Sequence, residues 1–308
     1  MPPPITVDEV GPRDGLQTEA ATVSTAEKLA LVRALGEAGL RCIEATSFVS
    51  PRWIPQLGDA DALVPSLPRL PGVSYVVLVP NARGLERLVE ALRRAGDAAP
   101  EVAAAVFMSA SESHNRKNLN RTVEESLREL GGVVPAALGH GLRVRGYVST
   151  VFGCPYEGAV DPERAAAIAE ALVGLGCDQV SLGDTIGVAT PALTRRVVER
   201  FLRTLPAPKL ALHMHDTRGT ALANVLAGLE LGITTFDSSI GGLGGCPYAP
   251  GASGNLATED IVYMLAGMGY ETGVDFDRLI AAGALAQRLV GRRLPGKTLQ
   301  AELARTEA

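Results

Sequence analysis

Apolar residues occur along the chain in short runs, and these runs alternate with longer segments that carry a helical repeat of apolar positions. The runs have the length and composition of buried strands, and several of the helical segments between them end near glycine or proline. The predicted strands lie at residues 5–10, 41–46, 73–79, 101–108, 143–151, 177–182, 209–215 and 234–240. Strands that alternate with helices predict βαβ units and a parallel sheet.

Eight such units predict an α/β chain folded as a (β/α)8 TIM barrel, which needs about 250 residues. We expect residues 1–274 to form the barrel and residues 275–308 to form extra C-terminal helices that cap it, all within a single domain. A doubly wound sheet is the alternative, and it would require a G-x-G-x-x-G turn after the first strand. The first turn is instead Gly-Pro-Arg-Asp-Gly at residues 11–15.

Composition and charge narrow the class of protein. The chain is 46% hydrophobic but only 4% aromatic, which suits short parallel strands beside Ala- and Leu-rich helices. A net charge of −5 argues against a nucleic-acid-binding protein, which would present a strongly basic face. No apolar run reaches the roughly 18–20 residues that a membrane span needs.

The cysteines and the N-terminal residues indicate the cellular compartment of the protein. The four cysteines are scattered without a C-x-x-C pair, so we expect neither a structural zinc site nor a disulfide scaffold. Residues 1–10 carry neither an apolar signal core nor an Arg/Ser-rich presequence. We therefore expect a cytoplasmic protein.

Polar residues gather where the predicted strands end, and barrel enzymes build their active sites at that edge. Any of these residues alone could be a helix N-cap, as we expect for Ser24, Ser50 and Thr190. Six strand ends of this kind indicate a catalytic mouth, and thus a single catalytic domain over residues 1–308. They carry Arg13 and Asp14, Glu44 to Ser47, Ser109 to Ser111, Ser149 and Thr150, Asp184 and Thr185, and His213 and His215.

The pair His213 and His215 indicates a metal site. Side chains alternate along a strand, so both imidazoles face one way while Met214 faces the other. Imidazole is the commonest metal ligand in proteins, although two rings could instead satisfy hydrogen bonds in the core. An amide oxygen from Asn255 could reach the same ion, or Asn255 could simply cap the last barrel helix. Nitrogen and oxygen donors without a thiolate favour octahedral Mg²⁺, Mn²⁺ or Co²⁺.

Two further segments are candidates for substrate handling. Residues 241–254 contain six glycines and Cys246, which predicts a lid over the mouth with a reactive thiol; a phosphate cradle and a buried filler cysteine are the alternatives. Residues 114–121 are the densest basic stretch near the mouth. A solvated charged loop is one interpretation, and a site that fits a phosphate-bearing substrate tail is the other.

Together these motifs resemble the hydroxymethylglutaryl-CoA lyase family over essentially the whole barrel. The resemblance rests on residues 9–17, 44–51, 181–185 and 213–216 and on the Gly-Gly-Cys-Pro-Tyr loop at 244–248. Isopropylmalate and homocitrate synthases are similar in the metal site but lack this cysteine loop. The resemblance implies an acyl-CoA substrate, a divalent cation (Mg²⁺ or Mn²⁺, with Co²⁺ possible) and a homodimer. It also implies retro-Claisen cleavage of (3S)-3-hydroxy-3-methylglutaryl-CoA to acetyl-CoA and acetoacetate.

The resemblance also implies a role for each candidate residue. Arg13 would stabilise the thioester enolate, Cys246 would protonate it, Asp184 would accept a proton, and Glu44 would orient the polar network around Arg13. The metal ligands would be Asp14, His213, His215 and Asn255. Residues that contact the substrate would be Arg13, Gln17, Ser47, Ser111, Tyr147 and Ser181.

Other functions use some of the same residue types. Amidohydrolase barrels carry His-x-His on the first strand and need further histidines, whereas here the pair is on the seventh and only His114 and His140 remain. A non-haem iron oxygenase would place two histidines and a carboxylate on a β-sandwich. A non-catalytic relative would have lost part of the site. A lyase for another 3-hydroxy-3-alkylglutaryl-CoA or for citramalyl-CoA would keep the machinery and differ only around the C3 substituent.

Overall fold

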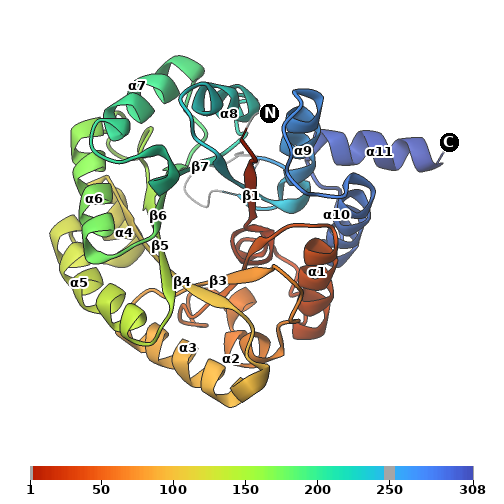
Figure 1. Ribbon diagram of the computed structural model, residues 1–308, viewed down its shortest axis with the longest axis horizontal. Helices are drawn as coiled ribbons and strands as arrows, with labels where there is room; N and C mark the ends of the chain where they lie inside the picture. Colours follow the sequence, from red (N-terminus) through yellow and green to blue (C-terminus); the bar gives the residue numbers. More distant parts are fainter. Residues whose placement is uncertain (1–2, 246–253, 308) are drawn as a thin grey trace.

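A computed structural model describes residues 3–245 and 254–307, and these form a closed barrel of eight parallel strands surrounded by helices (Figure 1). The strands follow one another around the barrel in sequence order, and β1 pairs with β8 to close it. Every predicted strand is present within two residues of its expected ends, so the predicted fold class is confirmed. The strands are β1 (Thr6–Glu9), β2 (Cys42–Ser47), β3 (Ser74–Leu78), β4 (Val102–Ser109), β5 (Arg143–Ser149), β6 (Gln179–Asp184), β7 (Leu210–Met214) and β8 (Thr235–Ser238).

Helices form an outer ring around these strands. The longer ones are α1 (Thr25–Glu37), α3 (Ala82–Ala95), α5 (Val123–Gly139), α6 (Pro162–Leu175), α7 (Pro191–Leu202), α8 (Ala221–Glu230) and α9 (Thr258–Gly267). Two short helices, α2 (Ala60–Leu63) and α4 (Glu112–Leu119), lie in loops. Among the described residues, no helix is long and apolar enough to cross a membrane.

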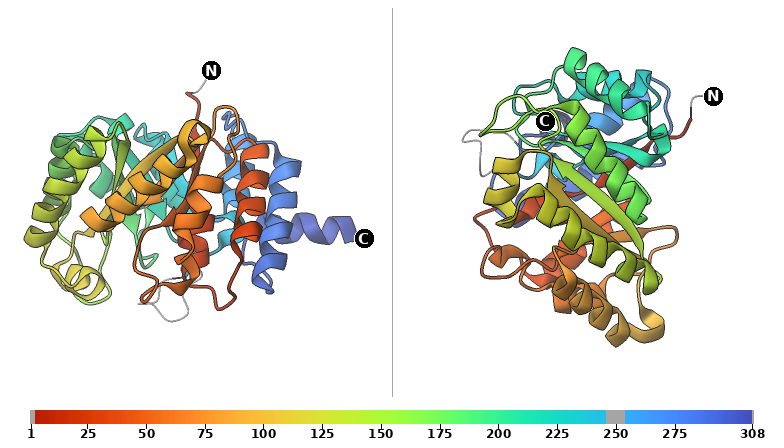
Figure 2. Two further views of the ribbon diagram at one scale, coloured as in Figure 1. Left: turned by 90° about the horizontal axis from the view of Figure 1, so that it is seen from below. Right: turned by 90° about the vertical axis from the view of Figure 1, so that its left-hand side faces the viewer.

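The C-terminal residues form the expected additional helices, α10 (Phe276–Val290) and α11 (Lys297–Glu307), but these do not cap the barrel as predicted. Helix α10 packs against α1 and α9, and α11 projects away from the barrel (Figures 1 and 2). The connection between them returns to the barrel, because the Gly296 amide donates to the Gly241 carbonyl over 2.9 Å.

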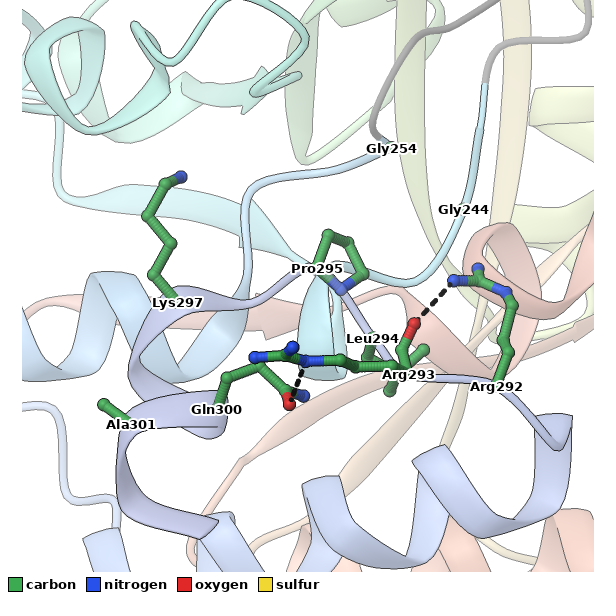
Figure 3. A pocket seen from close by; sticks show the side chains of 9 residues that line it. All are labelled: Gly244, Gly254, Arg292, Arg293, Leu294, Pro295, Lys297, Gln300 and Ala301. Carbon is green, nitrogen blue, oxygen red and sulfur yellow. Dashed lines mark hydrogen bonds between the residues drawn. The ribbon is translucent and has the colours of Figure 1, made fainter. Parts of the chain in front are cut away.

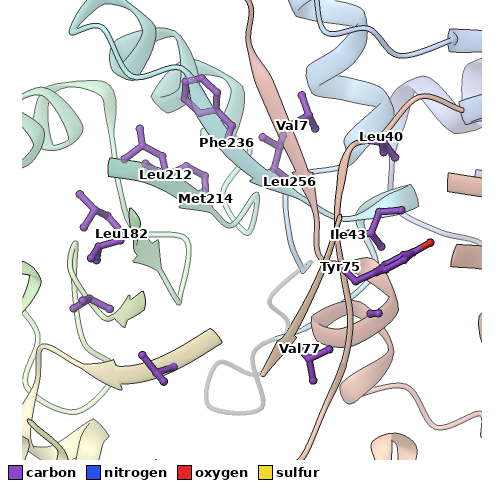
Figure 4. Packing of buried hydrophobic residues seen from close by; sticks show 14 of the residues in the cluster. Val7, Leu40, Ile43, Tyr75, Val77, Leu182, Leu212, Met214, Phe236 and Leu256 are labelled. Carbon is purple, nitrogen blue, oxygen red and sulfur yellow. The ribbon is translucent and has the colours of Figure 1, made fainter. Parts of the chain in front are cut away.

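The main apolar core lies between the strands and the helix ring (Figure 4). Alternation along β7 shows how it is built. Leu210, Leu212 and Met214 are buried in this outer core, whereas His213 belongs to the opposite face. The predicted direction of the histidine pair is therefore confirmed.

The barrel interior is different, because it combines a small apolar cluster with buried charges. Val76, Leu78, Ala103, Ala105 and Tyr147 form the apolar cluster. Charged side chains, from Asp8, Arg145 and Asp237, complete the interior and are each no more than 6% exposed. Barrel interiors are usually filled by branched apolar side chains, so this charged group needs its own explanation.

The prediction of a charged loop after β4 was wrong. Residues 112–119 form helix α4, because the Ser111 side chain accepts from the His114 amide as an N-cap. Glu112 in the first turn and Arg116 and Lys117 in the last turn also suit the helix dipole.

Two of the three expected serine and threonine N-caps are confirmed. Ser24 caps α1 in a capping box and Thr190 caps α7. Ser50 is followed by a turn rather than a helix, and the next short helix begins after Ile54.

Candidate active site and metal centre

The first βα connection is a tight turn that brings Arg13 and Asp14 to the barrel mouth. After β1 the backbone enters a π-helical turn, η1 (Gly11–Gly15), in which the Val10 carbonyl accepts from the amides of Arg13, Asp14 and Gly15. Gly11 has to be glycine, because a Cβ there would lie 2.6 Å from a carboxylate oxygen of Glu9. The Gly-Pro-Arg-Asp-Gly sequence therefore encodes the placement of two neighbouring charges.

All four predicted metal ligands converge at this mouth. The ligand atoms of Asp14, His213 and His215 lie within 4.8 Å of one another, and the two histidine Nε2 atoms are 3.2 Å apart. Asn255 joins them, because its Nδ2 donates to Asp14 Oδ2 over 2.8 Å. The capping alternative for Asn255 was wrong, since the N-cap of α9 is Ala257.

The donor atoms at this centre fit a divalent cation. Asn255 Oδ1 and His215 Nδ1 are buried and have no hydrogen-bond partner within residues 3–245 and 254–307. A buried polar atom without a partner is unfavourable, and coordination to an ion would satisfy the amide oxygen. One carboxylate, two imidazoles and an amide oxygen are nitrogen and oxygen donors of the kind that bind divalent cations.

Electrostatics keep Asp14 ionised and His215 neutral, which are the forms that bind metal. Burial alone would raise the pKa of Asp14, but Arg13 and the two histidines lower it to about 2. Burial, together with the neighbouring His213, lowers the pKa of His215 to about 3, so that this ring is neutral at pH 7. Burial opposes charge on His213 too, yet its hydrogen bond to Asp237 raises its pKa.

Arg13 is fixed between two carboxylates. Its Nη1 donates to Asp14 Oδ1 and its Nη2 lies against Glu44 Oε2, both at 2.6 Å. Burial alone would lower the pKa of Arg13, but Glu44 and Asp14 raise it, so the guanidinium stays charged. Glu44 therefore contacts the residue whose polar surroundings it is expected to orient.

Asp184 lies at the predicted strand end, but its carboxylate faces the loop after β6. Its two oxygens accept from the amides of Val188 and Ala189 over 2.9 and 3.0 Å. Burial raises the pKa of Asp184 to about 6.

The three predicted serine contacts are bonded within the protein. Ser47 accepts from the Val49 amide, Ser111 caps α4, and Ser181 Oγ donates to Asp237 Oδ2 over 2.7 Å.

Gln17, Tyr147 and Cys246 are the remaining predicted site residues. Gln17 is half-buried just after η1. The ring of Tyr147 lies near two guanidinium groups, 5.8 Å from Arg13 Cζ and 5.1 Å from Arg145 Cζ. Cys246 lies outside the described residues. The other three cysteines, Cys42, Cys154 and Cys177, are free thiols.

Ion pairs that were not predicted from the sequence lie beneath the centre. Arg145 lies between Asp8 Oδ2 at 2.7 Å and Asp237 Oδ1 at 2.6 Å. Burial opposes the charge on Asp237, but Arg145 and His213 lower its pKa to about 2. A charged residue at an inward position of each of three strands was the signal that would have revealed this group.

A cavity of about 740 Å³ lies between Gly244, Gly254 and the segment that follows α10 (Figure 3). Three cations line it, namely Arg292, Arg293 and Lys297. A second cavity, of about 340 Å³, includes both Lys297 and the metal-ligand candidate Asn255. The two cavities therefore share Lys297 and Pro295 as lining residues.

Comparison with known sequences shows the family. The model of the HMGL-like family matches residues 5–286. The mitochondrial hydroxymethylglutaryl-CoA lyase of Rattus norvegicus is 48% identical over 301 residues, which covers 98% of this chain and 90% of the rat protein.

Solved structures agree with the sequence comparison. The HMG-CoA lyase of Bacillus subtilis has a TM-score of 0.93 and 50% identity, over 98% of this chain and 100% of that one. An HMG-CoA lyase from Acinetobacter baumannii, solved in complex with coenzyme A and 3-methylmalate, has a TM-score of 0.89 and 39% identity, over 96% and 94% of the two chains. The chain therefore belongs to the HMGL-like family of carbon–carbon lyases.

Proposed function

We propose that this chain cleaves (3S)-3-hydroxy-3-methylglutaryl-CoA to acetyl-CoA and acetoacetate in a divalent-metal-dependent retro-Claisen reaction. The observation that carries the proposal is the convergence of Asp14, His213, His215 and Asn255 beside the buried guanidinium of Arg13. Cleavage of a 3-hydroxyacyl thioester needs an electrophile for the hydroxyl group and a cation for the enolate. Membership of the lyase family also argues against the hydrolase alternative.

The four ligands would hold Mg²⁺ or Mn²⁺, with Co²⁺ possible. When bound, such a cation supplies Lewis acidity that lowers the pKa of the tertiary hydroxyl and orients it. The protein prepares for this by holding Asp14 ionised and His215 neutral.

Arg13 is proposed to stabilise the negative oxygen of the thioester enolate. A guanidinium stays charged throughout and donates in a fixed fork, so it needs no reorganisation as the carbon–carbon bond breaks. Glu44 positions this fork through its contact with Nη2. The remaining Arg13 nitrogen, Nε, is buried without a hydrogen-bond partner within the described residues.

Two proton transfers complete the reaction. The hydroxyl proton passes to a base, the C2–C3 bond electrons become the enolate, and the oxygen left on C3 becomes the ketone of acetoacetate. We propose Asp184 as the base, because a buried carboxyl group with a pKa of about 6 is largely ionised at pH 7 and still basic enough to accept a proton. We propose Cys246 as the thiol that protonates the enolate carbon.

Substrate contacts are proposed for Arg13, Gln17, Ser47, Ser111, Tyr147 and Ser181. The serine hydroxyls already make bonds within the protein, but a hydroxyl has two lone pairs and one proton and can serve a second partner.

The tail of the acyl-CoA is proposed to lie in the cationic cavity. Arg292, Arg293 and Lys297 line it, and Lys297 also lines the smaller cavity that includes Asn255. Phosphate groups bind well to arginine and lysine side chains. The stretch at residues 114–121 is the competing location, and its Arg116 and Arg121 pair with Glu112 and Glu129. A homodimer and a cytoplasmic location stay predictions from the sequence.

A panel of thioesters tests the proposed substrate. We expect acetoacetate release from 3-hydroxy-3-methylglutaryl-CoA that is lost after chelation of divalent metal and restored by Mg²⁺ or Mn²⁺. Longer 3-hydroxy-3-alkylglutaryl-CoA analogues and citramalyl-CoA are the comparison compounds. Turnover of one of these without turnover of the methyl compound would reject the named substrate.

A further inference from the structure

We propose that Asp237, held in place by Arg145, fixes the tautomer and the ring orientation of His213, and in this way sets the affinity of the mouth for a divalent cation. The proposal rests on the metal site described above. It assigns a positioning role to two residues that touch neither the substrate nor the ion.

The contacts of His213 indicate which of its two ring nitrogens carries the proton. Asp237 and His213 are directly paired neighbours on β8 and β7, and Asp237 Oδ2 lies 3.2 Å from His213 Nδ1. An ionised carboxylate can only accept, so the proton of the ring must be on Nδ1. The lone pair of Nε2 then points to the opposite side, where His215 and Asp14 gather.

Asp237 itself is held from two other sides. Its Oδ1 accepts from Arg145 Nη2 over 2.6 Å, and its Oδ2 also accepts from Ser181 Oγ over 2.7 Å. The carboxylate is about 1% exposed, so water does not compete for it. With these two donors fixed around it, the carboxylate cannot turn to follow a moving imidazole.

A purely structural role is the competing explanation for these charges. Buried ion pairs are costly to desolvate and seldom increase stability over an apolar core, so filling the barrel would not by itself favour them. Asp8 offers an internal comparison. It binds the same guanidinium at 2.7 Å and is paired with Asp237 across β1 and β8, but its described ion pair is with Arg145 and not with a histidine.

Two matched variants separate the explanations. Asp237→Asn keeps the shape but can present an N–H to the ring, and we expect Mg²⁺ or Mn²⁺ to bind about 10- to 100-fold more weakly in calorimetry. Asp8→Asn makes the same chemical change next to Arg145, and we expect metal affinity within about threefold of wild type. Turnover in Asp237→Asn should recover at high metal concentration. Equal weakening in both variants, or wild-type affinity in Asp237→Asn, would overturn the proposal.

A measurement on the unmodified chain keeps the test independent of variant folding. Nitrogen-15 NMR of the histidine rings distinguishes the tautomers, and we expect His213 to be protonated at Nδ1 with Mg²⁺ bound. Protonation at Nε2 would overturn the proposal. Failure of the proposed function looks different, because a chain without lyase activity could still lose cation affinity in Asp237→Asn. Conversely, an active lyase whose Asp237→Asn variant binds metal normally contradicts only this inference.

Discussion

Arg13 shows how a single side chain can be prepared for chemistry before any ligand arrives. Its two terminal nitrogens are each 2.6 Å from a carboxylate, and its side chain is 9% exposed. A flexible cation would have to be ordered during the reaction, whereas this one is already ordered by Asp14 and Glu44. Preorganised charge of this kind is commonly the largest single contribution to catalysis.

Replacement of this guanidinium should therefore affect turnover far more than binding. In Arg13→Met we expect kcat to fall by about 10²- to 10³-fold, which is typical for loss of one preorganised donor to a developing oxyanion. Metal affinity measured by calorimetry should change much less, because the four ligands remain. Arg195→Met is a suitable control, since Arg195 pairs with Glu230 on the exterior. A variant that keeps a tenth of wild-type kcat would contradict the assigned role.

At the scale of elements, two buried glutamates join the first and last parts of the barrel. Glu9 Oε1 accepts from the amides of Gly11 and Ile240 over 2.7 and 2.8 Å, and its Oε2 accepts from Thr258 Oγ1 over 2.6 Å. Glu259 accepts from the Gly241 amide. These bonds tie β1, η1 and α9 to the turn after β8, η6 (Ile240–Gly242), from which the chain continues toward Cys246.

The charge state of these carboxyl groups predicts a pH-dependent stability. Burial raises the pKa of Glu259 to about 8 and that of Glu9 to about 7, both from 4.5. The folded state therefore holds protons that the unfolded chain has released above about pH 4.5. Their stabilising effect is complete below that pH and is lost as the pH rises through about 7 and 8.

Glu259→Gln removes one of these titrations. We expect the difference in melting temperature, variant minus wild type, to increase by several degrees as the pH is raised from 5 to 8.5. Glu124→Gln changes an exposed carboxyl group on α5 and should follow the wild-type profile. Parallel melting profiles for wild type and Glu259→Gln would show that this carboxyl group is not responsible.

The same elements show what could be predicted from sequence. The period of apolar positions located every strand, and the strand ends located Asp14, His213 and His215, because local spacing determines both. The pairing of Arg145 with Asp237 spans 92 positions, and it depends on the register between strands that no local pattern records. Helix α4 was not predicted for another reason. Its charged residues look like a solvated loop in the sequence, and only the structure shows that the Ser111 side chain caps it by accepting from the His114 amide.

For the whole molecule, charge is distributed unevenly around the mouth. The chain carries a net charge of −5, yet three cations come together where the connection between α10 and α11 meets η6. Arg292 pairs with Glu19, and Lys297 pairs with Asp216 at 2.7 Å. Arg293 bonds to the neutral side chain of Gln300 at 2.7 Å (Figure 3). Folding therefore brings a C-terminal basic segment beside a centre built from the rest of the barrel.

If the acyl-CoA tail lies in this cavity, removing its cations should weaken substrate binding without affecting the chemical step. In the double variant Arg293→Ala and Lys297→Ala we expect KM for the acyl-CoA to rise about tenfold, with kcat within about twofold of wild type. The KM of wild type should also rise with ionic strength, since exposed ion pairs are screened by salt. Arg116→Ala with Lys117→Ala, on α4, is the matched control and should leave KM nearly unchanged. Steady-state kinetics on both double variants tests this location. A KM that rises in the α4 double variant and not in the Arg293 and Lys297 double variant would place the phosphate-binding site at α4.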